Sequence, residues 1–175
     1  MAGVQLSRRS FVSALAAGLG ATPRRVHASL LARGAPTPGS IQTVLGPVLP
    51  ETVGPTLIHE HLLVDFIGAA AVSRSRYDGD QVFARALPFL EQARAQGLHT
   101  LVECTPAWLG RDPALLRRLS LASGVAIVTN TGFYGAADDK FVPAHAYKAS
   151  AGELSVAWID ERRTGSRGPA SGPGS

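Results

Sequence analysis

Short apolar runs alternate with segments of helical spacing over residues 41–161. The runs lie at Thr56–His61, Leu98–Cys104 and Val125–Thr129, and a glycine or proline directly precedes each of them. An apolar run of this length next to turn residues is typical of a buried strand. A shorter run, Ile41–Leu45, predicts one more strand near the start of this region.

Helical spacing follows each of the three longer runs. The first apolar stripe holds Pro88, which predicts a kink or a late helix start because proline lacks an N–H and clashes with the preceding turn. Asp112 followed by Pro113 predicts the start of a second helix, and Gly124 its end. A third helix is expected over Glu153–Glu161. The first stripe comprises Phe83, Ala86, Leu87 and Leu90.

Strand and helix alternate as β-α-β-α-β-α, which predicts the α/β class. Such an order favours a parallel sheet with right-handed crossovers, because each helix returns the chain to the same end of the sheet. The chain has 175 residues. A complete eight-stranded βα barrel typically needs about 250 residues, so the sequence predicts about three βα units.

Charge is distributed unevenly along the chain. All 13 acidic residues lie within residues 29–161, whereas four of the 17 basic residues lie in residues 1–28 and three in residues 162–175. The central part therefore carries ten basic residues and a net charge of −3. Nucleic-acid binding normally uses a basic surface, so we expect no nucleic-acid partner. The single cysteine, Cys104, excludes an internal disulfide.

Residues 1–28 have the pattern of a bacterial export signal. Ser7-Arg8-Arg9-Ser10-Phe11-Val12 is similar to a twin-arginine motif, which the export machinery reads. A short apolar segment follows over Phe11–Ala21, and Val26-His27-Ala28 is a cleavage-site pattern. We expect a twin-arginine signal peptide over 1–28, an Ala-, Pro- and Gly-rich linker over 29–40, and a periplasmic or extracellular location. A basic, disordered N-terminus is the alternative.

The His-x-His pair at the end of the first long run is the candidate site. Residues i and i+2 of a strand point to the same face, so His59 and His61 should present two imidazoles side by side. Two neutral imidazoles are half of a typical zinc ligand set. An exposed or hydrogen-bonded histidine pair without metal gives the same pattern.

Several motifs in order resemble the opening of the phosphotriesterase family, metal-dependent hydrolases of the amidohydrolase superfamily. The resemblance spans roughly residues 41–161 and rests on Gly54–Asp65, Thr100–Pro106, Leu109–Pro113 and Thr131–Tyr134. It implies a partial TIM barrel and a divalent, zinc-type metal, two per site in intact relatives. It also implies small-molecule substrates with ester, lactone or phosphotriester bonds, and metal-ligand roles for His59 and His61.

The resemblance also implies ligands that this chain does not supply. The family needs a carboxylated lysine, two more histidines and an aspartate from later strands. Lys140 and Lys148 are predicted in a loop, His145 is expected to contact that loop or substrate, and His99 stands at the amino end of a strand. The sequence contains no Gly-x-Gly-x-x-Gly motif, so a nucleotide-binding domain is not supported. An exported, non-catalytic metal- or ligand-binding protein is the alternative function.

Residues 162–175 contain no Leu, Ile, Val or Phe. Such a segment cannot bury a core, so we expect a disordered tail beyond the barrel part at 41–161. The residues of this segment can be written in GC-rich synonymous codons. When that nucleotide string is read in a shifted frame that starts at its third base, it encodes Ala-Asp-Gly-Ile-Pro-Gly-Thr-Gly-Ile-Arg-Pro-Gly-Phe. That string resembles what the family carries just before the strand with the bridging lysine. We therefore expect a frameshifted tail and a truncated, inactive chain.

Overall fold

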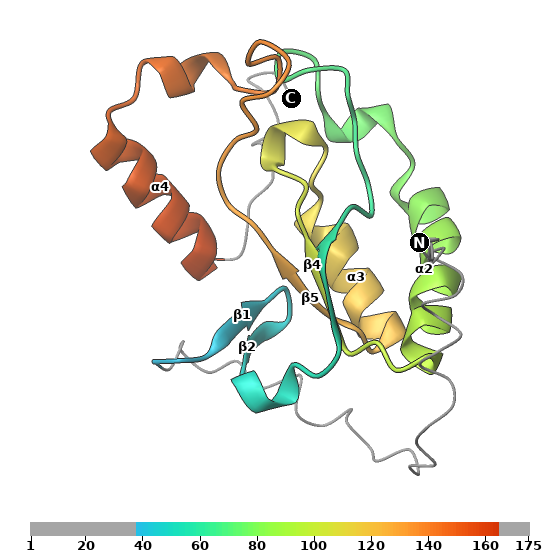
Figure 1. The fold of residues 1–175 in the computed structure, drawn as a ribbon. Helices are drawn as coiled ribbons and strands as arrows, with labels where there is room; N and C mark the ends of the chain where they lie inside the picture. The colour runs from blue at the N-terminus through green and yellow to red at the C-terminus, as the bar shows by residue number, and fades with distance from the viewer. Residues whose placement is uncertain (1–37, 165–175) are drawn as a thin grey trace, which may run out of the picture.

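A parallel three-stranded sheet organises the molecule. In the computed structural model, which describes residues 38–164, β3 (Thr56–Glu60), β4 (Thr100–Glu103) and β5 (Ala126–Thr129) pair in the order β3-β4-β5 (Figure 1). This parallel order confirms the predicted α/β class. The expected signal peptide, most of the expected linker and residues 165–175 lie outside the described residues.

Helices α2 (Gly79–Ala95) and α3 (Pro113–Ser123) cover one face of this sheet (Figure 1). Leu90 of α2 and Leu119 of α3 meet Leu101 and Ile127 from the sheet in one buried cluster. The periodic leucines thus form the contact between the helices and the strands, as their spacing predicts.

The start and end of α3 follow local sequence chemistry. The Asp112 carboxylate accepts the backbone N–H groups of Ala114 and Leu115, which satisfies donors that have no partner inside the helix. Pro113 stands at the first helical position, and Gly124 ends the helix with φ of 70°. All three predicted signals are confirmed.

Helix α2 corrects the expectation of a late start. It begins at Gly79, capped by Asp78, and continues through Pro88. Both Pro88 and Ala84, whose carbonyl loses its helical N–H partner at this proline, are exposed. Water can therefore replace the missing donor, and the helix tolerates the proline.

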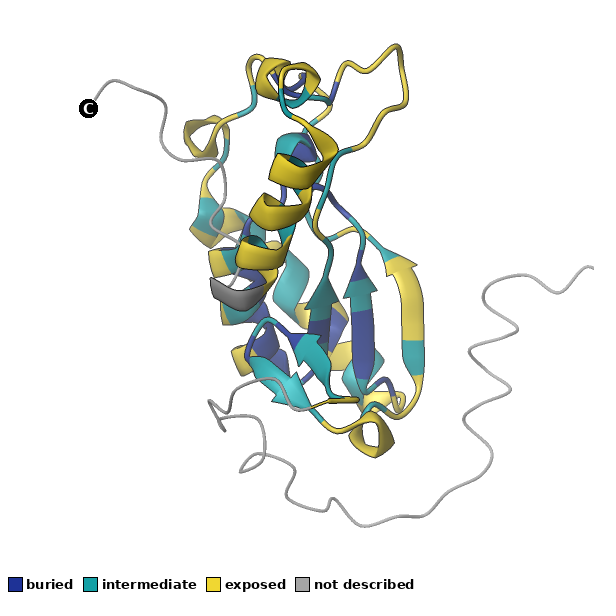
Figure 2. Cartoon of the chain, turned by 90° about the vertical axis from the view of Figure 1, so that its left-hand side faces the viewer, coloured by how far each residue is buried: buried dark blue, intermediate teal, exposed yellow. Residues whose placement is uncertain are grey.

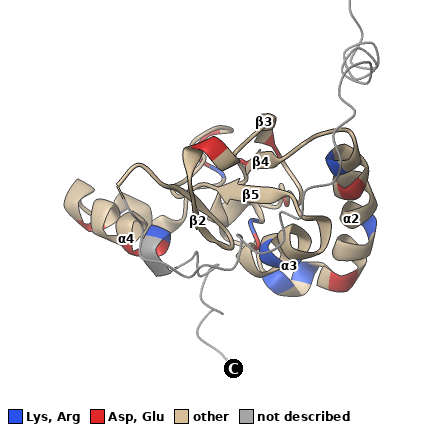
Figure 3. Ribbon diagram, turned by 90° about the horizontal axis from the view of Figure 1, so that it is seen from below, with Lys and Arg blue, Asp and Glu red and all other residues tan. Residues whose placement is uncertain are grey.

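Helix α2 has charged residues of both signs, and the charged residues of α3 are both arginines (Figure 3). Arg118 of α3 pairs with Asp80 at the start of α2 at 2.7 Å, and its guanidinium also lies over the Phe83 ring. These contacts join the two helices on the side away from the sheet.

A short hairpin precedes the parallel sheet. β1 (Ile41–Thr43) pairs antiparallel with β2 (Gly46–Val48), and the backbone N–H of Val44 donates to Ile127 of β5 at 2.8 Å. The predicted strand at Ile41–Leu45 is confirmed in part. The sequence did not predict its partner strand β2, because Gly46-Pro47 resembles a turn. In the structure both residues belong to β2.

Helix α4 (Ala151–Thr164) stands apart from the sheet (Figure 1). It extends the predicted third helix at both ends and includes the first three residues after the expected barrel part. Val156 and Ile159 are exposed on it. In the described part of the chain, short 3-10 helices lie in the connections, at Pro50–Thr52, Arg74–Arg76, Ala107–Leu109 and Ala144–Tyr147. Within residues 38–164, no helix has the length and apolar character needed to cross a membrane.

Burial increases from β3 to β4. Leu57 and Ile58 of β3 are 44% and 77% exposed, whereas Leu101 of β4 is 4% exposed (Figure 2). Among the described strands, β3 pairs on one side only, with β4. The sheet therefore has an open edge at the strand that leads to the candidate site.

Candidate metal centre

His59 and His61 lie at the carboxyl end of β3. His59 is in the strand and His61 directly follows it, and both are exposed. Their ring centroids are 5.3 Å apart in an edge-to-face arrangement of 71°. The predicted side-by-side placement of the two imidazoles is confirmed, while metal binding by them stays a prediction.

The pairing of β3 with β4 is irregular at this point. Leu57 pairs with Leu101 and Glu60 with Glu103, so β3 has one extra residue between the two pairs. Such an irregularity re-aims side chains and is common next to active sites. It lies directly before His61.

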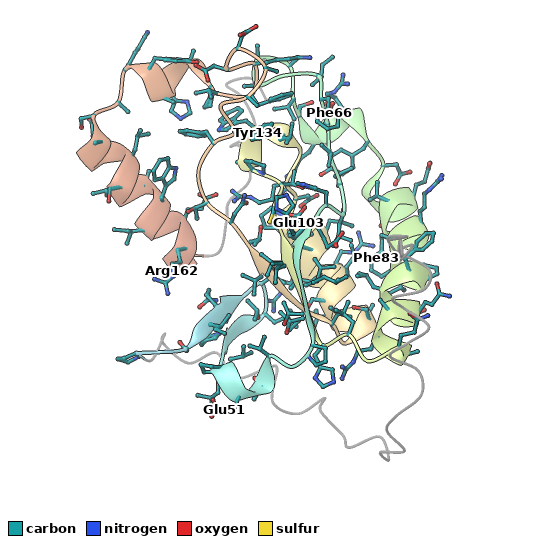
Figure 4. All side chains as sticks on the ribbon, viewed as in Figure 1. Glu51, Phe66, Phe83, Glu103, Tyr134 and Arg162 are labelled. Carbon is teal, nitrogen blue, oxygen red and sulfur yellow. The ribbon has the colours of Figure 1, made fainter. Side chains whose placement is uncertain are left out.

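A hydrogen-bonded chain of side chains connects His61 to β4. The Nδ1 atom of His61 lies 2.9 Å from Oγ1 of Thr105. That hydroxyl donates to Oε1 of Glu103, and the Thr105 backbone N–H donates to Oε2 at 3.2 Å. Glu103 is 1% exposed and Thr105 is fully buried (Figure 4 labels Glu103). The ring of His61 is thereby held by Thr105, which follows β4, and through Thr105 by Glu103 at the end of that strand.

Burial raises the pKa of the Glu103 carboxyl. Hydrogen bonds from Thr105 and Leu62 and the nearby charge of Arg111 partly oppose this effect. A carboxylate buried beside a histidine pair marks a functional-site candidate. Sequence reasoning missed Glu103 and Thr105, although an acid inside an apolar strand is itself a signal, because acids are rarely buried without partners.

The remaining histidines lie elsewhere. His99 stands before β4, where its ring is so close to Gly54 that a Cβ on Gly54 would lie 2.5 Å from Nδ1. This confirms its predicted place at the amino end of the sheet. His145 contacts Trp108 and Phe133 edge-to-face, with centroids 5.7 and 6.0 Å apart, as expected for a loop-contacting residue.

The donor set fits only part of a metal site. Two imidazoles are suitable zinc-type ligands, but structural and catalytic zinc sites take three or four protein ligands. Over residues 38–164, no group of three or more His, Cys, Asp or Glu residues is arranged to hold a metal ion. Lys140 and Lys148 both lie between β5 and α4, outside any strand. The described residues therefore offer two candidate ligands, and neither of their lysines lies in a strand.

Among the described residues, one of the clefts beside the sheet includes a candidate ligand. A cleft of about 530 Å³ between β3 and α2 is lined by His61, Glu60 and apolar side chains such as Leu63 and Phe89. A larger cleft of about 740 Å³ lies between β1, α3 and α4, with Arg117 and Thr129 in its lining. The smaller cleft includes His61 in its lining, but not His59.

Comparison with known proteins identifies the class of this fold and site. The profile of the Phosphotriesterase family matches residues 39–170. The solved structure of the organophosphorus hydrolase from Deinococcus radiodurans superposes with a TM-score of 0.60 and 30% identity, over 77% of this chain and 40% of that one. The chain belongs to the phosphotriesterase family, and its sheet is part of that family's barrel fold.

Curated relatives agree with this assignment. An N-acetyltaurine hydrolase from Tetraodon nigroviridis is 33% identical over 55% of this chain and 35% of its own length. An aryldialkylphosphatase from Saccharolobus solfataricus is 30% identical over 66% of this chain and 36% of its own length. This chain thus spans about a third of the length of these relatives. The names of both relatives describe hydrolytic enzymes.

Proposed function

We propose that His59 and His61 are metal ligands of a metal-dependent hydrolase site that acts on ester, lactone or phosphotriester bonds. The observation that carries this proposal is the placement of the two imidazoles side by side at the carboxyl end of a parallel strand. Barrel enzymes build their active sites at that end of the sheet. The family relationship supports the reaction class.

A bound divalent metal would act there as a Lewis acid and lower the pKa of a water molecule to about 7. The protein's own part is to hold the ring of His61 through Thr105 and to provide the adjoining cleft. Apolar side chains in this cleft would receive the apolar part of a substrate and exclude water from it. A small, largely apolar substrate is therefore favoured over a macromolecule.

The relatives' names span two kinds of bond. N-acetyltaurine contains an amide, whereas an aryldialkylphosphatase cleaves a phosphotriester. We therefore add the amide to the ester, lactone and phosphotriester bonds as a candidate for the bond that is cleaved. A panel with one substrate of each kind, assayed with a full-length relative that carries the same histidine pair, would distinguish them.

The number of ligands limits what this chain does by itself. Two imidazoles can hold one metal weakly, with water completing its coordination shell, but two-metal chemistry needs ions about 3.5–4 Å apart held by further ligands. Residues 38–164 supply no third ligand group. We therefore propose that the purified chain is inactive as a hydrolase. The same observation favours the second candidate, a non-catalytic metal-binding protein.

Metal titration tests the ligand assignment. Zinc or cobalt is added to the purified chain, and bound metal is measured by calorimetry and by elemental analysis after gel filtration. His59→Ala and His61→Ala should each abolish the weak binding. His99→Ala is the matched control, because this histidine adjoins a strand at the opposite end of the sheet, and it should bind like the wild type. Unchanged binding by the double variant His59→Ala/His61→Ala would refute the assignment.

Hydrolysis assays on the same preparation separate the two candidates. Metal binding without turnover of any substrate in the panel supports an inactive chain. Efficient metal-dependent hydrolysis that disappears in His61→Ala would overturn that part of the proposal.

Export is also proposed, from the twin-arginine pattern of residues 1–28. Export predicts a periplasmic or secreted product that stays in the cytoplasm after Arg8→Lys/Arg9→Lys.

A further inference from the structure

Two residues outside the histidine pair determine how His61 faces a metal. We propose that Thr105 and Glu103 are positioning residues for His61, whose proton they hold on Nδ1, so that the lone pair of Nε2 points away from the protein. The proposed function explains only what the arrangement is for. The position of the proton on His61 does not depend on a bound metal.

The direction of the hydrogen bonds follows from the donors. The backbone N–H groups of Thr105 and Leu62 can only donate, and they donate to Oε2 and Oε1 of Glu103 at 3.2 and 3.4 Å. As a carboxylate, Glu103 accepts at both oxygens and has no proton to donate to Thr105. The Thr105 hydroxyl also donates to Oε1, and a hydroxyl has a single proton to donate.

That single proton decides the tautomer of His61. Since the Thr105 hydroxyl gives its proton to Glu103, the same oxygen can only accept at its contact with His61, 2.9 Å away. Nδ1 of His61 must then carry the proton, and in the neutral ring Nε2 has the free lone pair. A free imidazole of histidine favours the opposite tautomer, with its proton on Nε2, so the chain of hydrogen bonds changes the ring's preference.

Burial makes the arrangement specific. Thr105 is fully buried and Glu103 is 1% exposed, so water does not compete for these groups. Metal-bound histidines generally donate their second N–H to such a partner, which fixes the ring and strengthens the ligand. Glu103 reaches His61 only through Thr105, which is why both are positioning residues.

The experiment measures the tautomer directly in the metal-free chain. Nitrogen-15 NMR of the histidine rings, with the His61 signals assigned from His61→Ala, reports which ring nitrogen carries the proton. The wild-type chain should show His61 protonated on Nδ1. A wild-type His61 with its proton on Nε2 would overturn the proposal without any variant.

Substitutions then test the role of the hydroxyl. Thr105→Val keeps the side-chain shape and should move the proton to Nε2, while zinc binding weakens about 10–100-fold. Thr105→Ser restores the hydroxyl and should restore both properties. Thr129→Val is the matched control, because its buried hydroxyl makes no hydrogen bond within the described residues. It should change neither the tautomer nor the zinc dissociation constant.

The two proposals fail in different ways. A correct tautomer that responds to Thr105→Val, in a chain that binds no zinc, supports the positioning role and refutes the metal site. Zinc binding that depends on His59 and His61, with a tautomer that Thr105→Val leaves unchanged, refutes the positioning role and supports the metal site.

Discussion

Arg111 forms an ion pair with Glu161 across 50 residues of the chain. The Arg111 side chain is completely buried, and its Nη1 also donates to the backbone carbonyl of Asn130, just after β5. Glu161 lies in α4, which otherwise stands apart from the sheet. Arg111 thus joins α4 to the carboxyl end of the sheet, on the side where the candidate site lies.

Removing the Glu161 carboxylate should lower the free energy of unfolding substantially. Glu161→Ala leaves the buried guanidinium of Arg111 without its carboxylate, and breaking a buried pair in this way costs about 3–5 kcal/mol. Urea denaturation followed by circular dichroism measures the change. Asp80→Ala is the control, because Asp80 and Arg118 form an exposed pair that is worth about 0–1 kcal/mol. Equal losses in the two variants would contradict the special role of the buried pair.

The open edge at β3 should promote self-association. Ile58 is 77% exposed on a strand that, within the described sheet, pairs on one side only. Exposed apolar edge strands recruit other chains, and a lysine on the edge opposes this. Light scattering at rising protein concentration should show less association for Ile58→Lys than for the wild type. Val156→Lys, at an exposed position on α4, should leave association unchanged. Equal effects of the two variants would exclude the edge as the cause.

The ion pair of Asp65 should give the protein a small acid sensitivity. Nε of Arg76 donates to Asp65 at 2.6 Å, and this contact, more than the backbone N–H of Ile67, lowers the Asp65 pKa from its ordinary value of 3.8. Since the folded pKa is the lower one, the stabilisation is present above pH 3.8 and is lost as the pH falls through the lowered pKa.

The expected size is small because the pair is partly exposed, at most about 1 kcal/mol. Asp65→Asn should remove this part of the acid-induced loss of stability, and Arg76→Ala should do the same while the carboxyl remains. The measurement is the free energy of unfolding at neutral pH and below pH 3.8. Acid profiles of both variants that match the wild type would show that this pair has no part in acid stability.

Local sequence signals determined much of this fold. The positions of β4, α3 and β5 follow from short apolar runs and from Asp112, Pro113 and Gly124, because strand alternation and helix caps depend on residues only a few positions apart. The adjacency of the two site histidines follows for the same reason, since residues two apart in a strand share a face.

Tertiary structure alone decided the surroundings of those histidines. Thr105 reaches His61 across 44 residues and Arg111 reaches Glu161 across 50. No periodic pattern encodes such contacts, because they depend on which strands become neighbours and on their exact register. The hairpin partner β2 and the exposure of β3 were likewise decided by pairing between segments. The sequence by itself thus determined the strands of the parallel sheet, helix α3 and the histidine pair, while packing determined the burial of Thr105 and Glu103 beside that pair.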